Sequence, residues 1–165
     1  GILPAVDVGK SVSRVGGKTQ LASYRQVVGD LRLSYSQFQE LEIFSRFGTQ
    51  LDENTKKTLT RGRRIREILK QNQYEPYSVL EQIILLLAVS RGLLDNIPIS
   101  KISIFKKRVK EDTKDKFSGI TEKINNNKTL SSDDKERLTY FIQEIIDSIV
   151  KDTDYADAGD NSQEN

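Results

Sequence analysis

Apolar residues recur every three or four positions along most of this chain, the spacing typical of amphipathic helices. The first such run extends from Leu21 to about Phe47, with a bend expected near Gly29. Its apolar positions are Leu21, Tyr24, Val28, Leu31, Tyr35, Phe38, Leu41 and Phe44. These positions predict one buried face along a long first helix.

The second and third helices carry recognisable start signals. Asp52 or Asn54 is placed to cap a helix that ends near Lys70, before a connector that contains Pro76. Ser78, with Glu81 three residues later, forms a capping box for a helix over 79–94. Nearly every residue from 79 to 89 is apolar, so we expect this helix to be buried on most of its surface and to form the core.

Three more helices follow. Pro98 and Ser100 start one that runs to about Lys116, and a second is punctuated by Gly119 and by the asparagines at 125–127. Ser131 with Asp134 caps a last helix to about residue 150. The sequence therefore predicts an all-α bundle of about six helices.

The two ends of the chain differ from this helical body. Residues 2–8 have the composition of a short strand but no partner strand elsewhere, so we expect residues 1–20 to be the edge of a larger domain. Residues 152–165 hold five acidic and no basic residues, which predicts a disordered acidic tail. The helical domain is then 21–151, whose charge together with that of residues 1–20 is +7.

Composition narrows the possible chemistry. The 165 residues suit one domain, and they include no cysteine and no histidine. These absences exclude disulfides, thiolate metal sites and histidine-based catalysis, and we predict no metal site in this chain. No apolar run reaches membrane-spanning length.

Gly17-Lys18-Thr19 matches the end of a phosphate-binding P-loop, G-x-x-x-x-G-K-[ST]. The first glycine of that motif would fall at position 12, which is Val12, and a β-branched residue does not adopt the backbone that glycine allows. No valine- and isoleucine-rich runs of a parallel sheet follow. We therefore reject a P-loop.

Two other functions deserve weighing. Basic runs could suggest a weak nucleic-acid-binding domain; they comprise Arg61, Arg63, Arg64 and Arg66, then Lys106, Lys107, Arg108 and Lys110. Acidic residues interrupt these runs and no aromatic residue is interleaved, which favours solvated helix faces. A stand-alone helical adaptor is the other alternative, but it predicts a self-contained N-terminus, whereas this chain starts in an unpaired strand.

Several segments, in order and spacing, resemble the C-terminal part of the alpha subunit of F-type ATP synthase. They are PAVDVGKSVSRVGGKTQ, QFQELEIFSRFGTQLDENT, LTRGRRIREILKQNQYEP, SVLEQI and SRGLLDNIP, and the likeness covers about residues 4–151. The opening GILPAVDVGKSVSRVGGKTQ is similar to an alternate bacterial subfamily, with coupling to protons or to sodium left open. The resemblance implies a regulatory, non-catalytic subunit that is no enzyme on its own.

The resemblance implies that Arg14, in SVSRVG with Ser13 beside it, is the arginine finger that reaches the catalytic nucleotide of a neighbouring beta subunit. The chemistry suits that role, because a guanidinium is always charged and forks toward phosphoryl oxygens where charge develops in the transition state. A loop arginine that is merely solvated is the alternative.

The resemblance also implies a non-catalytic nucleotide site, in which Gln71, Gln73 and Pro4 lie beside the adenine. Leu3 stands where mitochondrial relatives have arginine, which leaves the strength of base binding open. A further loop would face the central rotating stalk, with an ordinary helix connector as the alternative; it comprises Gly48, Thr49, Gln50, Leu51 and Asp52.

The same resemblance implies the setting of the whole protein. Its cofactors would be ATP or ADP with magnesium in the full-length subunit, with none bound tightly by this part alone. Its partners would be the beta, gamma and delta subunits of an ATP synthase on the cytoplasmic face of the bacterial inner membrane. Contact with that membrane would be made only through the complex, and no nucleic acid is expected.

Overall fold

The computed structural model describes residues 3–8, 10–11, 13–29, 31–46 and 51–160, with residues 153–160 described by their backbone alone. Within these residues the chain forms eight α-helices and one short 3-10 helix, and no β-strand. The elements are α1 (Arg14–Thr19), α2 (Ala22–Val28), α3 (Leu31–Ser45), α4 (Glu53–Leu69), α5 (Val79–Ser90), η1 (Ile99–Lys101), α6 (Ile102–Asp112), α7 (Ser118–Asn125) and α8 (Ser132–Asp160). The expected all-α fold is confirmed.

The strand expected over residues 2–8 is wrong for the part that the structure describes. Residues 3–8 form bends and a turn. A strand is stable only when its backbone groups pair with another strand, and the described residues offer none. The segment is therefore irregular, with Val8 packed against the core and Leu3 and Val6 exposed.

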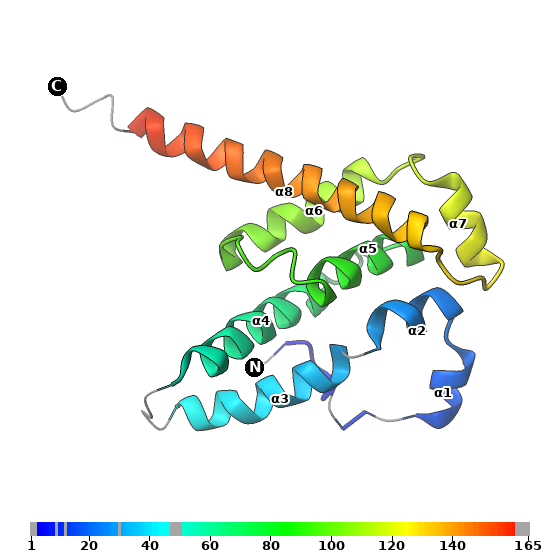
Figure 1. Cartoon of the computed structure of the whole chain (residues 1–165), viewed down its shortest axis with the longest axis horizontal. Helices are drawn as coiled ribbons and strands as arrows, with labels where there is room; N and C mark the ends of the chain where they lie inside the picture. The colour runs from blue at the N-terminus through cyan, green and yellow to red at the C-terminus, as the bar shows by residue number, and fades with distance from the viewer. Residues whose placement is uncertain (1–2, 9, 12, 30, 47–50, 161–165) are drawn as a thin grey trace.

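Helix α5 lies between two groups of helices (Figure 1). On one side α3 packs along α4, and α2 lies against α5; on the other side α8 runs beside α6. Helix α5 contacts α2, α4, α6, α7 and α8. The expectation that the most apolar helix would be central is met.

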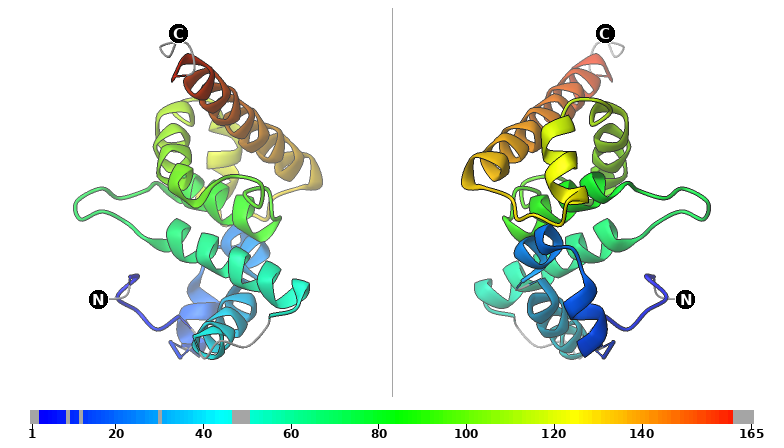
Figure 2. Two further views of the ribbon diagram at one scale, coloured as in Figure 1. Left: turned by 90° about the vertical axis from the view of Figure 1, so that its left-hand side faces the viewer. Right: turned by 90° about the vertical axis from the view of Figure 1, so that its right-hand side faces the viewer.

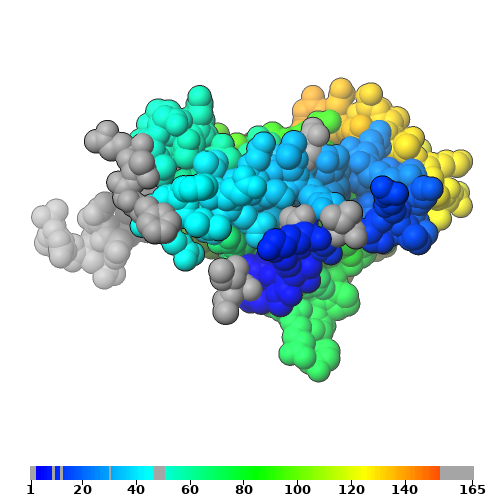
Figure 3. All heavy atoms as spheres, turned by 90° about the horizontal axis from the view of Figure 1, so that it is seen from below, coloured from blue at the N-terminus to red at the C-terminus, as the bar shows by residue number. Residues whose placement is uncertain are grey.

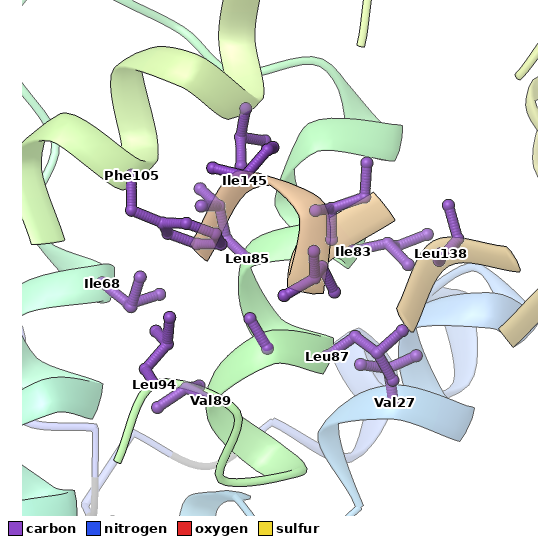
Figure 4. Close-up of a cluster of buried hydrophobic side chains, with 14 of the residues drawn as sticks. Val27, Ile68, Ile83, Leu85, Leu87, Val89, Leu94, Phe105, Leu138 and Ile145 are labelled. Carbon is purple, nitrogen blue, oxygen red and sulfur yellow. The ribbon is translucent and has the colours of Figure 1, made fainter. Parts of the chain in front are cut away.

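The capping box at the start of α5 is present as expected. The Ser78 Oγ accepts from the Glu81 amide at 3.3 Å, and a Glu81 carboxylate oxygen accepts from the Ser78 amide at 2.7 Å. Ile83, Ile84 and Ala88 are fully buried. Figure 4 shows the side chains gathered around this helix from α2, α4, α6 and α8, among them Val27, Ile68, Phe105, Leu138 and Ile145. Full burial of each Leu, Ile or Phe stabilises by roughly 1.5–3 kcal/mol, so this packing is the main source of stability.

The long first helix is divided into α2 and α3. Gly29 ends α2, and α3 starts at Leu31, so the expected bend is a break in the helix. The predicted buried stripe holds at Tyr35 and Phe38 but is wrong at Phe44, whose side chain is 64% exposed. Phe44 lies near the end of α3 that points away from α5, where nothing in the described part of the chain covers it (Figure 1).

Helix α8 begins as expected and ends later. Ser131 and Asp134 form the predicted cap, with the Ser131 Oγ accepting from the Asp134 amide at 3.1 Å. The helix continues to Asp160, ten residues past its expected end at Val150 and into the segment expected to be a disordered tail. Adding a residue to an existing helix needs no new nucleus, and no proline interrupts residues 151–160.

Helix α2 receives its N-terminal cap from a distant loop. Its own preceding residue, Leu21, has no side chain that can cap it. The Asn127 side-chain oxygen instead accepts from the Ala22 amide at 2.8 Å. The Gln26 side chain adds a second link: its Nε2 donates to the Leu130 carbonyl at 3.0 Å, and its Oε1 accepts from the Leu130 backbone amide at 2.9 Å. The loop between α7 and α8 thus fixes α2 against the body.

Gly62 allows α3 and α4 to approach closely. A Cβ at this position would lie 1.9–2.3 Å from three carbons of Phe38, which is fully buried. Such a distance is far inside van der Waals contact, and a buried ring has no free space to move into. The helix pair therefore requires glycine here.

We predict that Gly62→Ala destabilises the protein. Helix propensity alone would make alanine better by about 1 kcal/mol. The clash with Phe38 should outweigh that gain and give a net loss of roughly 1–3 kcal/mol in the free energy of unfolding, measured with urea. Gly119→Ala in α7 is the matched control, since its Cβ would meet nothing within 4 Å. Equal stability of the two variants would contradict the close approach.

We also predict a specific loss of stability in acid. Burial raises the pKa of the Asp134 carboxyl, but hydrogen bonds from Lys123 and Ser131 and the charge of Lys123 lower it by more, so the net pKa is below its ordinary value. A carboxyl with a lowered folded-state pKa stabilises the fold above its unfolded pKa and loses that effect as the pH falls. Asp134→Asn should therefore be less stable than the wild type at pH 7, and the gap should close below about pH 4. A gap that is constant with pH in urea unfolding would refute this.

Candidate functional site

Arg14 is the first residue of α1, a helix that has no buried residue. The Ser13 Oγ caps this helix by accepting from the Gly16 amide at 2.9 Å. Arg14 itself is exposed. The cap thus fixes the backbone from which Arg14 extends, while its guanidinium faces solvent and is available to another molecule.

The local structure also argues against a P-loop. In that motif the Gly-Lys-Thr triplet opens a helix, so that backbone amides converge on phosphate. Here Gly17, Lys18 and Thr19 are the last three residues of α1. The Thr19 hydroxyl donates to the carbonyls of Val15 and Gly16 at 3.1 and 3.0 Å. The triplet therefore closes a helix.

Gln71 and Gln73 lie in the connector between α4 and α5, which projects from the helices (Figure 2). Both are exposed. The connector is braced internally, because the Gln71 side-chain amide donates to the Glu75 carbonyl at 3.0 Å and the Asn72 amide donates to the Glu75 carboxylate at 3.1 Å. This bracing leaves the Gln71 side-chain oxygen available to accept a hydrogen bond.

The structure brings Gln71 together with Leu3, the neighbour of Pro4. Both line a hollow of about 590 Å³, whereas Gln73 and the half-buried Pro4 do not. The space-filling view shows the N-terminal segment beside the projecting connector (Figure 3). Of the three residues predicted for nucleotide binding, Gln71 thus lines the hollow, Pro4 follows the lining residue Leu3 in the chain, and Gln73 does not line it.

Residues of α6 that the sequence reasoning did not single out for this site line the same hollow. The ammonium groups of Lys106 and Lys110 lie 5.8 and 5.9 Å from the centre of the Tyr77 ring, which also lines it. Burial is the main cause that lowers the pKa of Lys106. The sequence could have indicated this pair, because residues four positions apart on a helix lie on the same face.

The loop predicted to face a stalk is only partly described. Gly48, Thr49 and Gln50 lie outside the described residues, Leu51 is half-buried, and Asp52 caps α4. The Asp52 carboxylate accepts from the Thr55 amide and hydroxyl, both at 2.9 Å, and these bonds lower its pKa. Of the two candidate caps, Asp52 is thus the one in use.

The sequence suggested that the basic runs are solvated helix faces, and this holds for the exposed Arg63 and Lys107 but is wrong for Arg64 and for most of the other members. Arg64 is only 6% exposed, and its guanidinium donates to the carbonyls of Leu94, Asp95 and Ile97 at 2.7–2.8 Å. Arg61 donates to the carbonyls at the end of α5. Arg64 and Arg61 thus donate to carbonyls of the turn after α5 and of the end of α5, and the Leu94 carbonyl also accepts from the Ile97 amide at 3.1 Å.

Other members of the runs are held in the same way. Arg66 makes two hydrogen bonds to the Glu42 carboxylate, at 2.8 and 2.6 Å, and lies 4.7 Å from the centre of the Phe38 ring. The Arg66 hydrogen bond is the main cause that lowers the pKa of Glu42. Lys106 donates to carbonyls at the end of α4, and Arg108 pairs with Asp152 at 2.6 Å. Most of this positive charge therefore joins helices and is not presented to an anionic polymer.

Within the described part of the chain, no group of three or more acidic side chains is arranged to hold a metal ion. No helix among the same residues is long and apolar enough to cross a membrane. Among the described residues, the exposed Arg14 and the hollow beside Gln71 bear on the predicted function.

Comparison with known proteins identifies the family. The family model described as the ATP synthase alpha/beta chain, C terminal domain, matches residues 20–145. The chain belongs to this family. It is 57% identical over 138 residues to ATP synthase subunit alpha 2 of Syntrophus aciditrophicus (strain SB), and 51% identical over 130 residues to ATP synthase subunit alpha 1 of Rhodopirellula baltica (strain DSM 10527 / NCIMB 13988 / SH1).

These matches cover 84% and 79% of this chain but only 27% and 26% of the two relatives. ATP synthase subunit alpha 1 of Chlorobium luteolum (strain DSM 273 / BCRC 81028 / 2530) is 49% identical over 84% of the chain and 27% of its own length. The chain thus corresponds to the C-terminal part of an ATP synthase alpha subunit, and it spans about a quarter of those relatives. The sequence-based resemblance is confirmed.

We predict that Arg64→Lys destabilises this alpha-subunit domain by roughly 1–3 kcal/mol, the scale of buried carbonyls left without a donor. Lysine keeps the charge but lacks the planar fork that reaches three carbonyls at once. Thermal unfolding should show a lower midpoint, with Arg63→Lys, one position away and exposed, close to wild type. Unchanged stability of Arg64→Lys would mean that the carbonyls find other donors.

Proposed function

We propose that this chain serves a rotary ATP synthase as part of its non-catalytic alpha subunit, and that Arg14 is an arginine finger for the catalytic site of a neighbouring beta subunit. The observation that carries the proposal is the exposed Arg14 on a capped helix that contributes nothing to the core. A side chain so placed has no structural task that the described residues reveal. The relatives named as ATP synthase alpha subunits support the setting.

The chemical role of Arg14 is electrostatic. As water attacks the terminal phosphoryl group of ATP, negative charge spreads over the equatorial oxygens of the transition state. The Arg14 guanidinium would donate two hydrogen bonds to those oxygens and gain or lose no proton, because it stays charged at every relevant pH. Ser13 would hold the backbone beneath it through the cap on Gly16. The chain has no enzymatic activity of its own in this proposal.

A second nucleotide, ATP or ADP with magnesium, would bind the alpha subunit itself. The free side-chain oxygen of Gln71 can accept from the amino group of an adenine, and Leu3 offers an apolar contact to the ring. Gln73 and Pro4, which do not line the hollow, would complete the base site. None of the described residues is assigned to magnesium. Fewer nucleotides retained per complex in Gln71→Leu would support this assignment, and an unchanged number would remove it.

The wider setting is part of the same proposal. The domain would pack against beta subunits and, through the loop at 48–52, against the central gamma stalk, with delta as a further partner. The complex would lie on the cytoplasmic face of a bacterial inner membrane and couple proton or sodium transport to ATP synthesis. A nucleic-acid function is disfavoured, because the arginines of α4 and α6 are largely engaged within the protein.

The test is ATP hydrolysis by the complex assembled with the full-length subunit. Arg14→Ala should lower steady-state turnover by about 10³-fold or more while nucleotide still binds. Arg14→Lys should also lose most turnover, since it keeps the charge without the fork. Arg63→Lys is the matched control. Near-normal turnover of Arg14→Ala in an assembled complex would exclude Arg14 as the finger and leave the family membership untouched.

A further inference from the structure

A glutamine near the start of α5 ties the projecting connector to the helical body. The Gln82 Nε2 donates to the backbone carbonyl of Tyr77 at 2.8 Å. Tyr77 directly precedes Ser78, the N-cap of α5, and Gln82 is half-buried. This bond therefore fixes the place where the connector meets the helix.

The other end of the Gln82 amide is held from α2. The Tyr24 hydroxyl donates to the Gln82 Oε1. A backbone carbonyl only accepts, so the amide nitrogen must face Tyr77 and the amide oxygen must face Tyr24. Burial raises the pKa of the Tyr24 hydroxyl, which therefore keeps the proton that it donates at neutral pH. The two partners thus determine the orientation of this amide.

Tyr77 lines two hollows. One is the hollow of about 590 Å³ that Gln71 also lines, and the other has a volume of about 110 Å³ and is lined in part by Gln82. Lys70, Gln71 and Tyr77 line both. Because the two hollows share these residues, the position of Tyr77 affects the shape of each.

The start of the connector is held separately from its end. Lys106 of α6 donates to the carbonyl of Lys70, the residue before Gln71. Gln71 is therefore held through α4 and α6, whereas Tyr77 is held through Gln82 of α5. Loss of the Gln82 bond would let Tyr77 shift relative to Gln71 and would change the hollow that both line.

We propose that Gln82 is a positioning residue for the nucleotide hollow: it holds the connector in the place from which Gln71 reaches the base, and Tyr24 orients it. This inference rests on the proposed contact between Gln71 and adenine. Gln82 and Tyr24 do not line the larger hollow, so both act through the connector. The consequence is base selectivity, because an acceptor oxygen held in one place distinguishes an amino group from a carbonyl.

Inosine diphosphate (IDP) provides the measurement, because its base carries a carbonyl where adenine carries an amino group. The Gln71 oxygen can accept from the amino group but repels a carbonyl oxygen. The complex assembled with the full-length subunit is freed of nucleotide and mixed with equal concentrations of ADP and IDP, and the nucleotides retained after gel filtration are counted. Gln71→Leu gives the number retained at other sites, so the difference is the share of this hollow. That share should favour ADP by about tenfold in the wild type, the scale of one hydrogen bond.

Gln82→Glu isolates the bond to Tyr77. The new carboxylate keeps the shape of the amide and still accepts from Tyr24, but at about pH 8 it is ionised and cannot donate to the Tyr77 carbonyl. The preference for ADP over IDP should fall to about twofold or less, because the bond that holds the connector is lost. Gln37→Glu on α3 is the matched control, since Gln37 is exposed and lines neither hollow. It should keep the preference of the wild type.

Tyr24→Phe gives an independent measurement. It removes one oxygen and keeps the ring, so it decides the question if the complex does not assemble with Gln82→Glu. Gln82 then loses the partner that orients its amide. The preference for ADP should fall in this variant as well.

Two results would overturn the positioning role. Loss of ADP and IDP in equal proportion would show that Gln82 supports the fold alone. An unchanged preference in both Gln82→Glu and Tyr24→Phe would show that the connector keeps its place without this amide. If the wild type and Gln71→Leu retain the same nucleotides in the same ratio, the contact between Gln71 and the base fails instead, and the positioning role falls with it.

Discussion

The buried guanidinium of Arg64 holds together the turn on which the helical arrangement depends. Helix α5 is apolar on nearly all sides, so other helices must cover it all round. The chain therefore has to reverse direction after α5 ends, so that the helices that follow can pack against it. The carbonyls of Leu94, Asp95 and Ile97 in this turn face α4; the Leu94 carbonyl also accepts from the Ile97 amide at 3.1 Å, and a buried carbonyl without a donor is costly. One side chain from α4 satisfies all three. With the turn fixed, α6 and α8 can close over α5.

The same solution is used elsewhere in the molecule. Arg61 and Lys106 donate to carbonyls at the ends of α5 and α4, and Asn127 caps α2 from another loop. Each bond joins a helix end to a side chain from a different element. Helix ends carry partial charges and unpaired groups, so these contacts fix position as well as add stability. These basic residues connect one helix to another within the domain.

Arg14 and Arg25, near α1, are among the arginines outside this network, as are the exposed Arg46, Arg63 and Arg137. Arg14 projects from a short helix with no buried residue, and Arg25 lines a hollow beside that helix. Stability requires neither side chain, as far as the described contacts show. The exposure of Arg14 leaves its guanidinium available for contacts with another protein. The family of ATP synthase alpha chains supplies a setting in which such contacts are expected.

The sequence by itself determined the helical class, the capping boxes at Ser78 and Ser131, and the burial of α5, because these depend on residues close along the chain. The family could also be recognised from the sequence, because its motifs are short segments in a fixed order along the chain. Only the tertiary structure decided that Arg64 is buried, that Phe44 is exposed, and that residues 3–8 form no strand. Each of these depends on what lies opposite in space, and a local pattern of polar and apolar residues carries no information about partners more than thirty residues away.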